Sequence, residues 1–255
     1  MKAILKVFGI LFGFAVIACA ALVIYISTLD PNDYKSLIAE KFQEETGRSL
    51  NFEDDINVTI YPWLGLETNG ITVGNASGFG DSPFLHTDHT MVRIKFMPLL
   101  QEKYEIDTVR LYGLSVNLVT DVAGRTNWED LVEQQDDRGQ SESGNISLAA
   151  MVLGGVDIRD ASITWDDQTN GNRSAISNFM LKTGELVFGE PIDVNMTFDA
   201  VSNKPELEAD VTFTSTISYD LKNEIYDIAP LDFSLTLVGP NVSQNSTDIT
   251  LQSAW

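Results

Sequence analysis

The sequence predicts a mainly β protein with one N-terminal transmembrane helix and one amphipathic helix directly after it. Three observations support this fold class. An uncharged apolar run opens the chain, a short segment with helical spacing follows, and the remainder repeatedly alternates apolar with polar residues. With 255 residues, 44% of them hydrophobic, the chain is long enough for one or two folded domains.

The apolar run extends from Val7 to Ile26 and contains no charged residue. A helix of this length spans roughly 30 Å, the thickness of one hydrocarbon core. Lys2 and Lys6 precede the run, so the positive-inside rule places the N-terminus in the cytoplasm and the bulk of the chain on the far side of the membrane. We therefore assign residues 1–28 to a single-pass transmembrane anchor.

Two alternatives remain open for the apolar run. A secretory signal peptide has an apolar region of about 7–15 residues followed by a cleavage site, whereas here the apolar residues continue to Ile26. Val16–Cys19 has the pattern of a lipoprotein processing box, although the residues after Cys19 are apolar rather than polar. All three interpretations place residues 30–255 in the same compartment. Cys19 is the single cysteine, which excludes intramolecular disulfides and cysteine-ligated metal sites.

The chain is strongly acidic, with 16 Lys and Arg against 37 Asp and Glu and a net charge of −21. Because Lys2 and Lys6 precede the apolar run, 14 basic residues remain after it and the net charge there is −23. Such a surface repels phosphate, which argues against nucleic acid as a partner and gives no general attraction to anionic lipid head groups. We interpret the acidity as a contribution to solubility.

A helix is predicted immediately after the anchor. Asp30 is a suitable N-cap, Pro31 fits the first helical position, and Gly47 is a suitable C-terminal cap. The apolar residues between them have helical spacing and form one stripe: Tyr34, Leu37, Ile38 and Phe42.

After Gly47 the apolar period changes from 3.6 to 2, which predicts strands with one apolar and one solvated face. This pattern is typical of antiparallel neighbours in a sheet. The clearest strands are Ile56–Ile60, Val92–Phe96, Val109–Leu111, Val116–Leu118, Val194–Phe198, Val211–Phe213 and Leu231–Leu237.

Between Glu133 and Ser147 the composition shifts to Gln, Asp, Gly, Ser and Glu, which predicts a flexible linker or loop over residues 133–147. It separates residues 29–132, the helix plus β-sheet, from residues 148–255, which continue the strand pattern. An internal repeat crosses this linker, because residues 109–118 can be laid over residues 156–165 with their apolar positions matched. Gly113 and Asp160 match as bends between two short strands. Chance similarity between short strands is the alternative.

Catalytic motifs are missing from the sequence: no nucleophile elbow, phosphate loop or dinucleotide fingerprint occurs. His86 and His89, with Asp81 and Asp88 nearby, could bind a metal but lack the third ligand and open geometry of a catalytic zinc site. We expect a polar loop there, and we predict no catalytic residue, metal or cofactor. The protein is therefore not expected to be an enzyme.

Trp63 lies in an apolar bend, Pro62–Leu66. It is a candidate for the membrane interface, together with Tyr34 of the predicted helix. Packing in an ordinary core is the alternative for Trp63.

Segments spread over most of the chain resemble the AsmA family of bacterial envelope proteins. No segment is diagnostic alone, and their order along the chain makes the resemblance specific. They are Asp30–Lys35, Thr46–Arg48, Tyr61–Leu66, Gly74–Gly80, Met97–Leu100, Gly124–Trp128, Gly155–Ile158, Ala161–Asp167, Leu181–Gly184 and Leu235–Leu237.

The resemblance implies a protein anchored in the inner membrane of a Gram-negative envelope, with the bulk of the chain in the periplasm and a role in outer-membrane biogenesis. It also implies a chorein-like architecture, in which a curved antiparallel sheet forms an apolar groove that carries phospholipid. Family members are usually longer, so we do not expect this chain to span the envelope by itself. The residues expected to line the groove are Val92, Ile94, Phe96, Val109, Leu111, Val116 and Leu118.

The expected partners are phospholipid, the inner membrane and other envelope proteins. An alternative is a non-enzymatic assembly scaffold whose apolar face binds proteins rather than lipid. The strand alternation supports both readings equally, so the sequence leaves the choice open.

Overall fold

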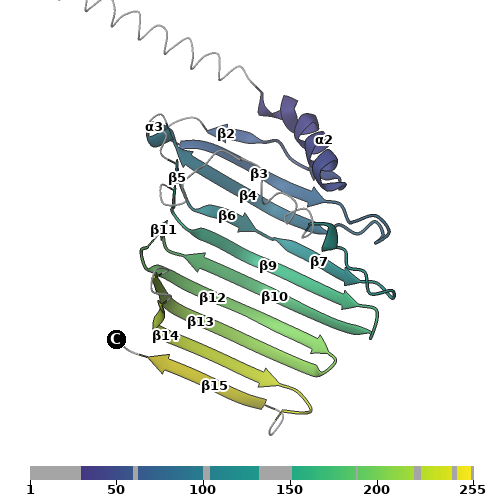
Figure 1. The fold of residues 1–255 in the computed structure, drawn as a ribbon, viewed down its shortest axis with the longest axis vertical. Coiled ribbons are helices and arrows are strands. Elements are labelled where there is room, and N and C mark those ends of the chain that lie inside the picture. Colours follow the sequence, from purple (N-terminus) through teal and green to yellow (C-terminus); the bar gives the residue numbers. More distant parts are fainter. Residues whose placement is uncertain are drawn as a thin grey trace, which may run out of the picture.

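The computed structural model describes residues 30–59, 63–99, 104–131, 151–187, 189–220, 225–242 and 246–253. Within these ranges the chain is mainly β and forms one large mixed sheet with few helices (Figure 1). No helix in this part of the chain is long and apolar enough to cross a membrane. The predicted anchor, residues 1–28, and the predicted linker, residues 133–147, lie outside the described residues.

The predicted helix is present as a 3₁₀ turn, η1 (Pro31–Tyr34), that continues into α2 (Lys35–Thr46). The Asp30 side chain accepts a hydrogen bond from the Asn32 backbone N–H at 2.9 Å, which satisfies a free donor at the helix start. Gly47 ends the helix in the left-handed region with φ of 72°. Both predicted boundaries are therefore confirmed.

Fifteen strands form the sheet in the described residues. The strands are β1 (Leu50–Phe52), β2 (Asn57–Thr59), β3 (Trp63–Val73), β4 (Leu85–Lys95), β5 (Tyr104–Ile106), β6 (Val109–Tyr112), β7 (Ser115–Thr120), β8 (Met151–Leu153), β9 (Val156–Asp167), β10 (Asn172–Thr183), β11 (Leu186–Val187), β12 (Ile192–Asn203), β13 (Glu206–Asp220), β14 (Ile225–Val238) and β15 (Ser246–Ser253).

The long strands follow one another across the sheet from β3 to β15, and α2 lies at the β3 end (Figure 1). Most neighbours are antiparallel, as predicted. The prediction of an antiparallel sheet is wrong at two places, because β5 pairs with β8 in parallel and β6 and β7 pair with β9 in parallel. Residues on both sides of the predicted linker thus contribute to the same sheet.

The predicted repeat corresponds to the parallel pairing of β6 and β7 with β9. Val109 lies opposite Val156 and Leu118 opposite Trp165, which is the register in which the two segments align in sequence. Parallel neighbours run in the same direction, so two copies of one pattern can lie side by side with every apolar position matched. The repeat therefore has a structural counterpart.

A line of left-handed residues crosses the first half of the sheet, and we call it the crease. It consists of Gly70 in β3, Gly113 between β6 and β7, Asp160 in β9 and Asn178 in β10, with φ values of 63°, 63°, 53° and 52°. Gly113 lies opposite Asp160, since the flanking pairs are Tyr112–Arg159 and Ser115–Ser162. The predicted bends at Gly113 and Asp160 are confirmed.

Two strand predictions around β4 are wrong. The strand ends at Lys95, and Phe96 begins the short helix α3 (Phe96–Leu99). Pro98 explains the difference, because it has no N–H for a strand ladder but fits the first turn of a helix. His86 and His89 lie inside β4 rather than in a loop.

The sheet forms a single layer with little enclosed core. Among the described residues, only three hydrophobic side chains are buried: Ile56, Phe84 and Ala161. α2 packs principally against β1 at one end of the sheet, so it does not cover the strands from β9 to β15 (Figure 1). Most apolar side chains of the strands therefore remain partly accessible.

Candidate functional site

One side of the sheet carries the apolar members of the alternating strands, and we call it the apolar face. Residues paired across neighbouring strands point to the same side, so the register defines the face. Val92 pairs with Leu66, Leu111 with Thr90, and Val116 with Leu85. Towards the C-terminal strands the face continues through Ile163, Ile176, Phe198, Val211, Leu235 and Ile249.

Six of the seven residues predicted to line a groove lie on this face. They are Val92, Ile94, Val109, Leu111, Val116 and Leu118, as the pairings with β3, β4 and β9 show. Phe96 does not belong to the set, because it lies in α3 beyond the end of the strand.

The crease keeps the apolar face continuous. A regular strand places residues three apart on opposite sides, yet the hydroxyls of Thr87 and Thr90 in β4 lie 3.4 Å apart. The same change of parity separates Leu111 from Val116, on the two sides of Gly113. In each strand that crosses the crease, the apolar residues therefore occupy odd-numbered positions on one side of the crease and even-numbered positions on the other. This shift keeps them on one side of the sheet.

Three small side chains of the apolar face are buried along the crease. Thr68, Thr87 and Ala161 flank the crease on this face and are 7%, 3% and 3% exposed. In a flat single-layer sheet, solvent would reach Thr and Ala side chains on either face. The apolar face is therefore enclosed along the crease.

Away from the crease the apolar face is open. Leu66 is 55% exposed at the N-terminal end of the sheet, Trp165 is 42% exposed near the middle, and Leu251 is 53% exposed on β15. Single exposed apolar residues are common on protein surfaces, whereas a contiguous series over successive strands marks an interaction surface.

The face also contains a hollow of about 340 Å³ between β7 and β13. It is lined by small side chains, among them Ser174, Ala200 and Ala209, and by Trp165. The indole Nε1 of Trp165 donates to the Thr120 hydroxyl at 3.1 Å, which holds the ring in place. Sequence analysis missed the hollow, because small residues within a strand carry no signal until their cross-strand neighbours are known.

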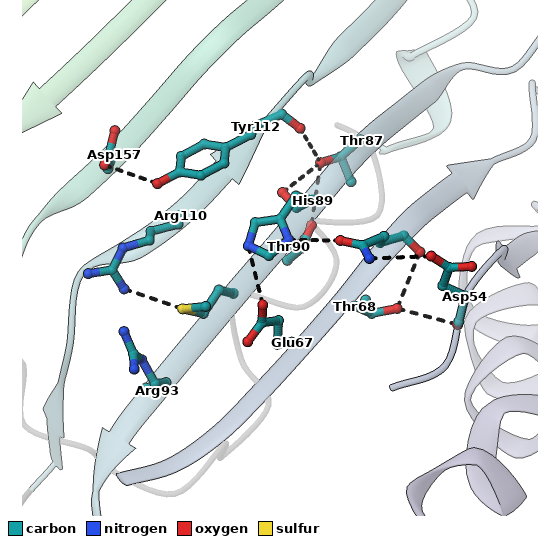
Figure 2. Close-up of polar contacts among 12 residues, drawn as sticks. Asp54, Glu67, Thr68, Thr87, His89, Thr90, Arg93, Arg110, Tyr112 and Asp157 are labelled. Carbon is teal, nitrogen blue, oxygen red and sulfur yellow. Dashed lines mark hydrogen bonds and ion pairs between the residues drawn. The ribbon is translucent and has the colours of Figure 1, made fainter. Parts of the chain in front are cut away.

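The opposite side of the sheet is polar, and both histidines lie on it. The His89 ring stacks on Tyr112 with centroids 5.4 Å apart, its Nδ1 lies 2.9 Å from Asn69 Oδ1, and its Nε2 lies 3.8 Å from Glu67 Oε1 (Figure 2). His86 contacts the Asp88 carboxylate at 3.1 Å. In the part of the chain that the structure describes, no three His, Cys, Asp or Glu residues gather as metal ligands.

Ion pairs and carboxylates extend along the polar side. The Tyr112 hydroxyl donates to Asp157 at 3.3 Å (Figure 2). Hydrogen bonding from the Arg159 guanidinium, at 2.7 Å, lowers the pKa of Asp157. Further along, Asp210 lies opposite Asp199, and the hydrogen bond between these two carboxyl groups raises the pKa of Asp210. The polar side therefore carries paired charges, and one of them, Asp157, is buried among its contacts with Tyr112 and Arg159.

The two interface candidates are both accessible, but they lie in different places. The predicted bend at Pro62–Leu66 is wrong over Trp63–Leu66, because these residues lie in β3. Trp63 is on the polar side of this strand, with Lys95 Nζ 5.6 Å from its ring centroid. It is half-buried rather than part of a core. Tyr34 ends η1 at the start of α2 and is 46% exposed.

A buried cation joins α2 to the middle of the chain. The Arg48 side chain is 1% exposed and donates from Nη2 to the Asn127 carbonyl at 2.6 Å and to Asp130 Oδ1 at 2.5 Å. Its guanidinium also lies over the Phe84 ring, 4.3 Å from the centroid. Arg48 and Asn127 were noted in the sequence only as parts of the resemblance, and their contact could not be predicted from it.

Asn127 completes this connection and is fully buried. Its Nδ2 donates to Asn75 Oδ1 and to the Asn117 carbonyl, each at 2.8 Å. Its Oδ1 accepts from the Val119 N–H at 2.9 Å. Three of the segments that carry the family resemblance therefore meet at this point.

These features define a class of protein: a single-layer β-sheet with a solvated polar side and an open, continuous apolar face, closed at one end by a helix. The family model of the AsmA family matches residues 1–229, and the chain belongs to that family. Membership indicates a role in the bacterial envelope, and the family is not known for enzymatic activity. A comparison with curated proteins finds no match.

Proposed function

We propose that the protein is anchored in the inner membrane, projects into the periplasm, and binds or conducts phospholipid on its apolar face as part of outer-membrane biogenesis. One observation carries the proposal: the apolar face continues from β3 to β15 on a single-layer sheet, and α2, which packs principally against β1, lies at one end of it. Under this proposal the protein acts by binding rather than by catalysis.

The energetics favour an apolar occupant. Removing apolar surface from water contributes about 25 cal/mol of favourable free energy per Å². Any apolar chain that covers this face is therefore bound favourably. Acyl chains suit an open apolar face because they are flexible and carry no polar group that would need a partner. The hollow beside Trp165 adds space for such a chain at β9 and β10.

Adjacent, nearly isosteric residues allow a direct test. Val211 lies on the apolar face of β13, opposite Phe198 and Leu235, and Thr212 points to the polar side of the same strand. A photoreactive amino acid would replace either residue in the full chain in living cells. Mass spectrometry would then identify what each probe captures after irradiation.

We expect phospholipid adducts from position 211 and few or none from position 212. Protein adducts alone at position 211 would favour the assembly scaffold over lipid binding. Lipid adducts of equal yield at both positions would show that the apolar face has no special role, and the proposal would then fail.

A further inference from the structure

α2 has a second apolar surface, which the sheet does not cover. Tyr34, Leu37 and Ile38 are 46%, 50% and 42% exposed, and we call these three residues the exposed flank. The side that packs toward β1 carries residues that are not exposed, such as Ala39 and Phe42. The predicted stripe is thus divided, because Phe42 turns toward the sheet and the other three residues do not.

Helix geometry explains the division. Residues three and four apart share one side of a helix, so positions 34, 37 and 38 form a single surface. Farther along the same side lie Lys41 and Glu44, which form an ion pair at 2.5 Å. The apolar part of this surface is therefore confined to the beginning of the helix.

The beginning of the helix is also the part nearest the N-terminal apolar run. Four residues separate Ile26 from Pro31. At no more than about 3.5 Å per residue, they can span at most about 14 Å. If the run crosses a bilayer, as the proposed function holds, the exposed flank lies close to the surface from which the chain emerges.

We propose that the exposed flank binds the interfacial layer of that same bilayer. Leu37 and Ile38 would enter the boundary between head groups and acyl chains, where amphipathic helices bury their apolar side. The Tyr34 ring suits the head-group level, because one end of it is apolar and the other is polar. The helix and its flanking turns are acidic, so the matching surface is a zwitterionic phospholipid bilayer rather than an anionic one.

Docking of the helix would orient the whole sheet, because α2 is tied to it. Asn32 Oδ1 accepts from the Ile56 N–H at 2.8 Å, and Lys35 Nζ lies 3.0 Å from Asp55 Oδ1. The apolar face begins beside the helix with Val58 and Leu66, which are paired and are 38% and 55% exposed. The bilayer and the start of the apolar face would then adjoin.

Site-specific fluorescence on the full chain tests this inference. In a Cys19→Ser background, one cysteine would be placed at Leu37 or Ile38 and labelled with an environment-sensitive dye. Ser36 and Gln43 provide matched controls, because both are exposed positions on other sides of α2. The proteins would be reconstituted into phosphatidylcholine vesicles with or without lipid that carries a nitroxide quencher near the head group.

We expect at least threefold stronger quenching at positions 37 and 38 than at 36 and 43. Equal quenching at all four positions, or disulfide cross-linking of position 37 between two copies without quenching, would overturn the inference. Alkaline extraction separates this inference from the anchor on which it rests. Unquenched protein that resists extraction would refute docking and leave the anchor standing. Quenched protein that is released by extraction would refute the anchor, and unquenched protein that is released would refute both.

Discussion

At the residue scale, the most enclosed side chains in the described part of the chain are polar: Arg48 and Asn127. A buried guanidinium is costly unless it is paired and hydrogen-bonded. Arg48 meets this condition at Nε and Nη2, through Asp130 and the Asn127 carbonyl, while its buried Nη1 has no hydrogen-bond partner. These contacts connect residues about eighty positions apart. We infer that this contact fixes α2 at its place on the sheet.

Replacing Arg48 by Met should therefore destabilise the protein. We expect the free energy of unfolding to fall by about 2–4 kcal/mol, because the Asn127 carbonyl and the Asp130 carboxylate lose their buried partner. Denaturant unfolding of the full chain in detergent, followed by circular dichroism, measures the change. The control is Arg125→Met, which removes a 65% exposed arginine from its pair with Asp121 and should cost far less. Equal losses for the two variants would contradict the role assigned to Arg48.

At the element scale, the crease decides which side chains share a face. Asp160 adopts a left-handed conformation that glycine enters freely and Asp tolerates, whereas β-branched residues are strongly disfavoured there. Gly113, the neighbour of Asp160 between β6 and β7, cannot be replaced by a larger residue without a shift, because a Cβ at this position would collide with the Asp88 carboxylate. The crease therefore depends on the backbone conformation of Asp160 and on the absence of a side chain at Gly113.

Two substitutions at Asp160 test this dependence. Asp160→Gly should leave the free energy of unfolding within about 1 kcal/mol, because relief of the left-handed backbone is offset by greater freedom of the unfolded chain. Asp160→Val should lower it by about 1–2 kcal/mol. Thermal unfolding of both variants is compared with that of Thr212→Val, an exposed strand position outside the left-handed region. If Asp160→Val is no more destabilising than Thr212→Val, the crease is not maintained by this residue.

At the scale of the whole molecule, the topology of the chain remains a prediction, because residues 1–29 lie outside the described part. Lys2 and Lys6 before the apolar run favour a cytoplasmic N-terminus. Under this topology, alkaline phosphatase fused after Trp255 should be active and green fluorescent protein fused there should be dark. The reverse result would contradict both the topology and the periplasmic function.

Cys19→Ser should change neither the size of the protein nor its membrane attachment, whereas a shift in size would favour the lipoprotein alternative.

The sequence alone determined the features that depend on neighbouring residues. Asp30 and Gly47 marked the ends of the helix because caps act on the backbone within one turn. Alternation located parts of β4, β12, β13 and β14 but not β3, β10 or β15. The repeat was visible in the sequence, whereas the parallel pairing of its two copies, β6 and β7 with β9, was not predicted. Local rules also produced the errors, since the period alone could not separate Phe96 from the strand before it.

Tertiary structure decided which of these elements meet, and on which side. Continuity of the apolar face depends on a change of parity in several neighbouring strands, and the hollow beside Trp165 depends on small residues from different strands. The exposure of Tyr34, Leu37 and Ile38 depends on how α2 rests on β1. Periodicity can show that a helix or strand has an apolar side, but only the arrangement of the other elements determines whether that side is covered, because burial is a property of contacts between distant segments.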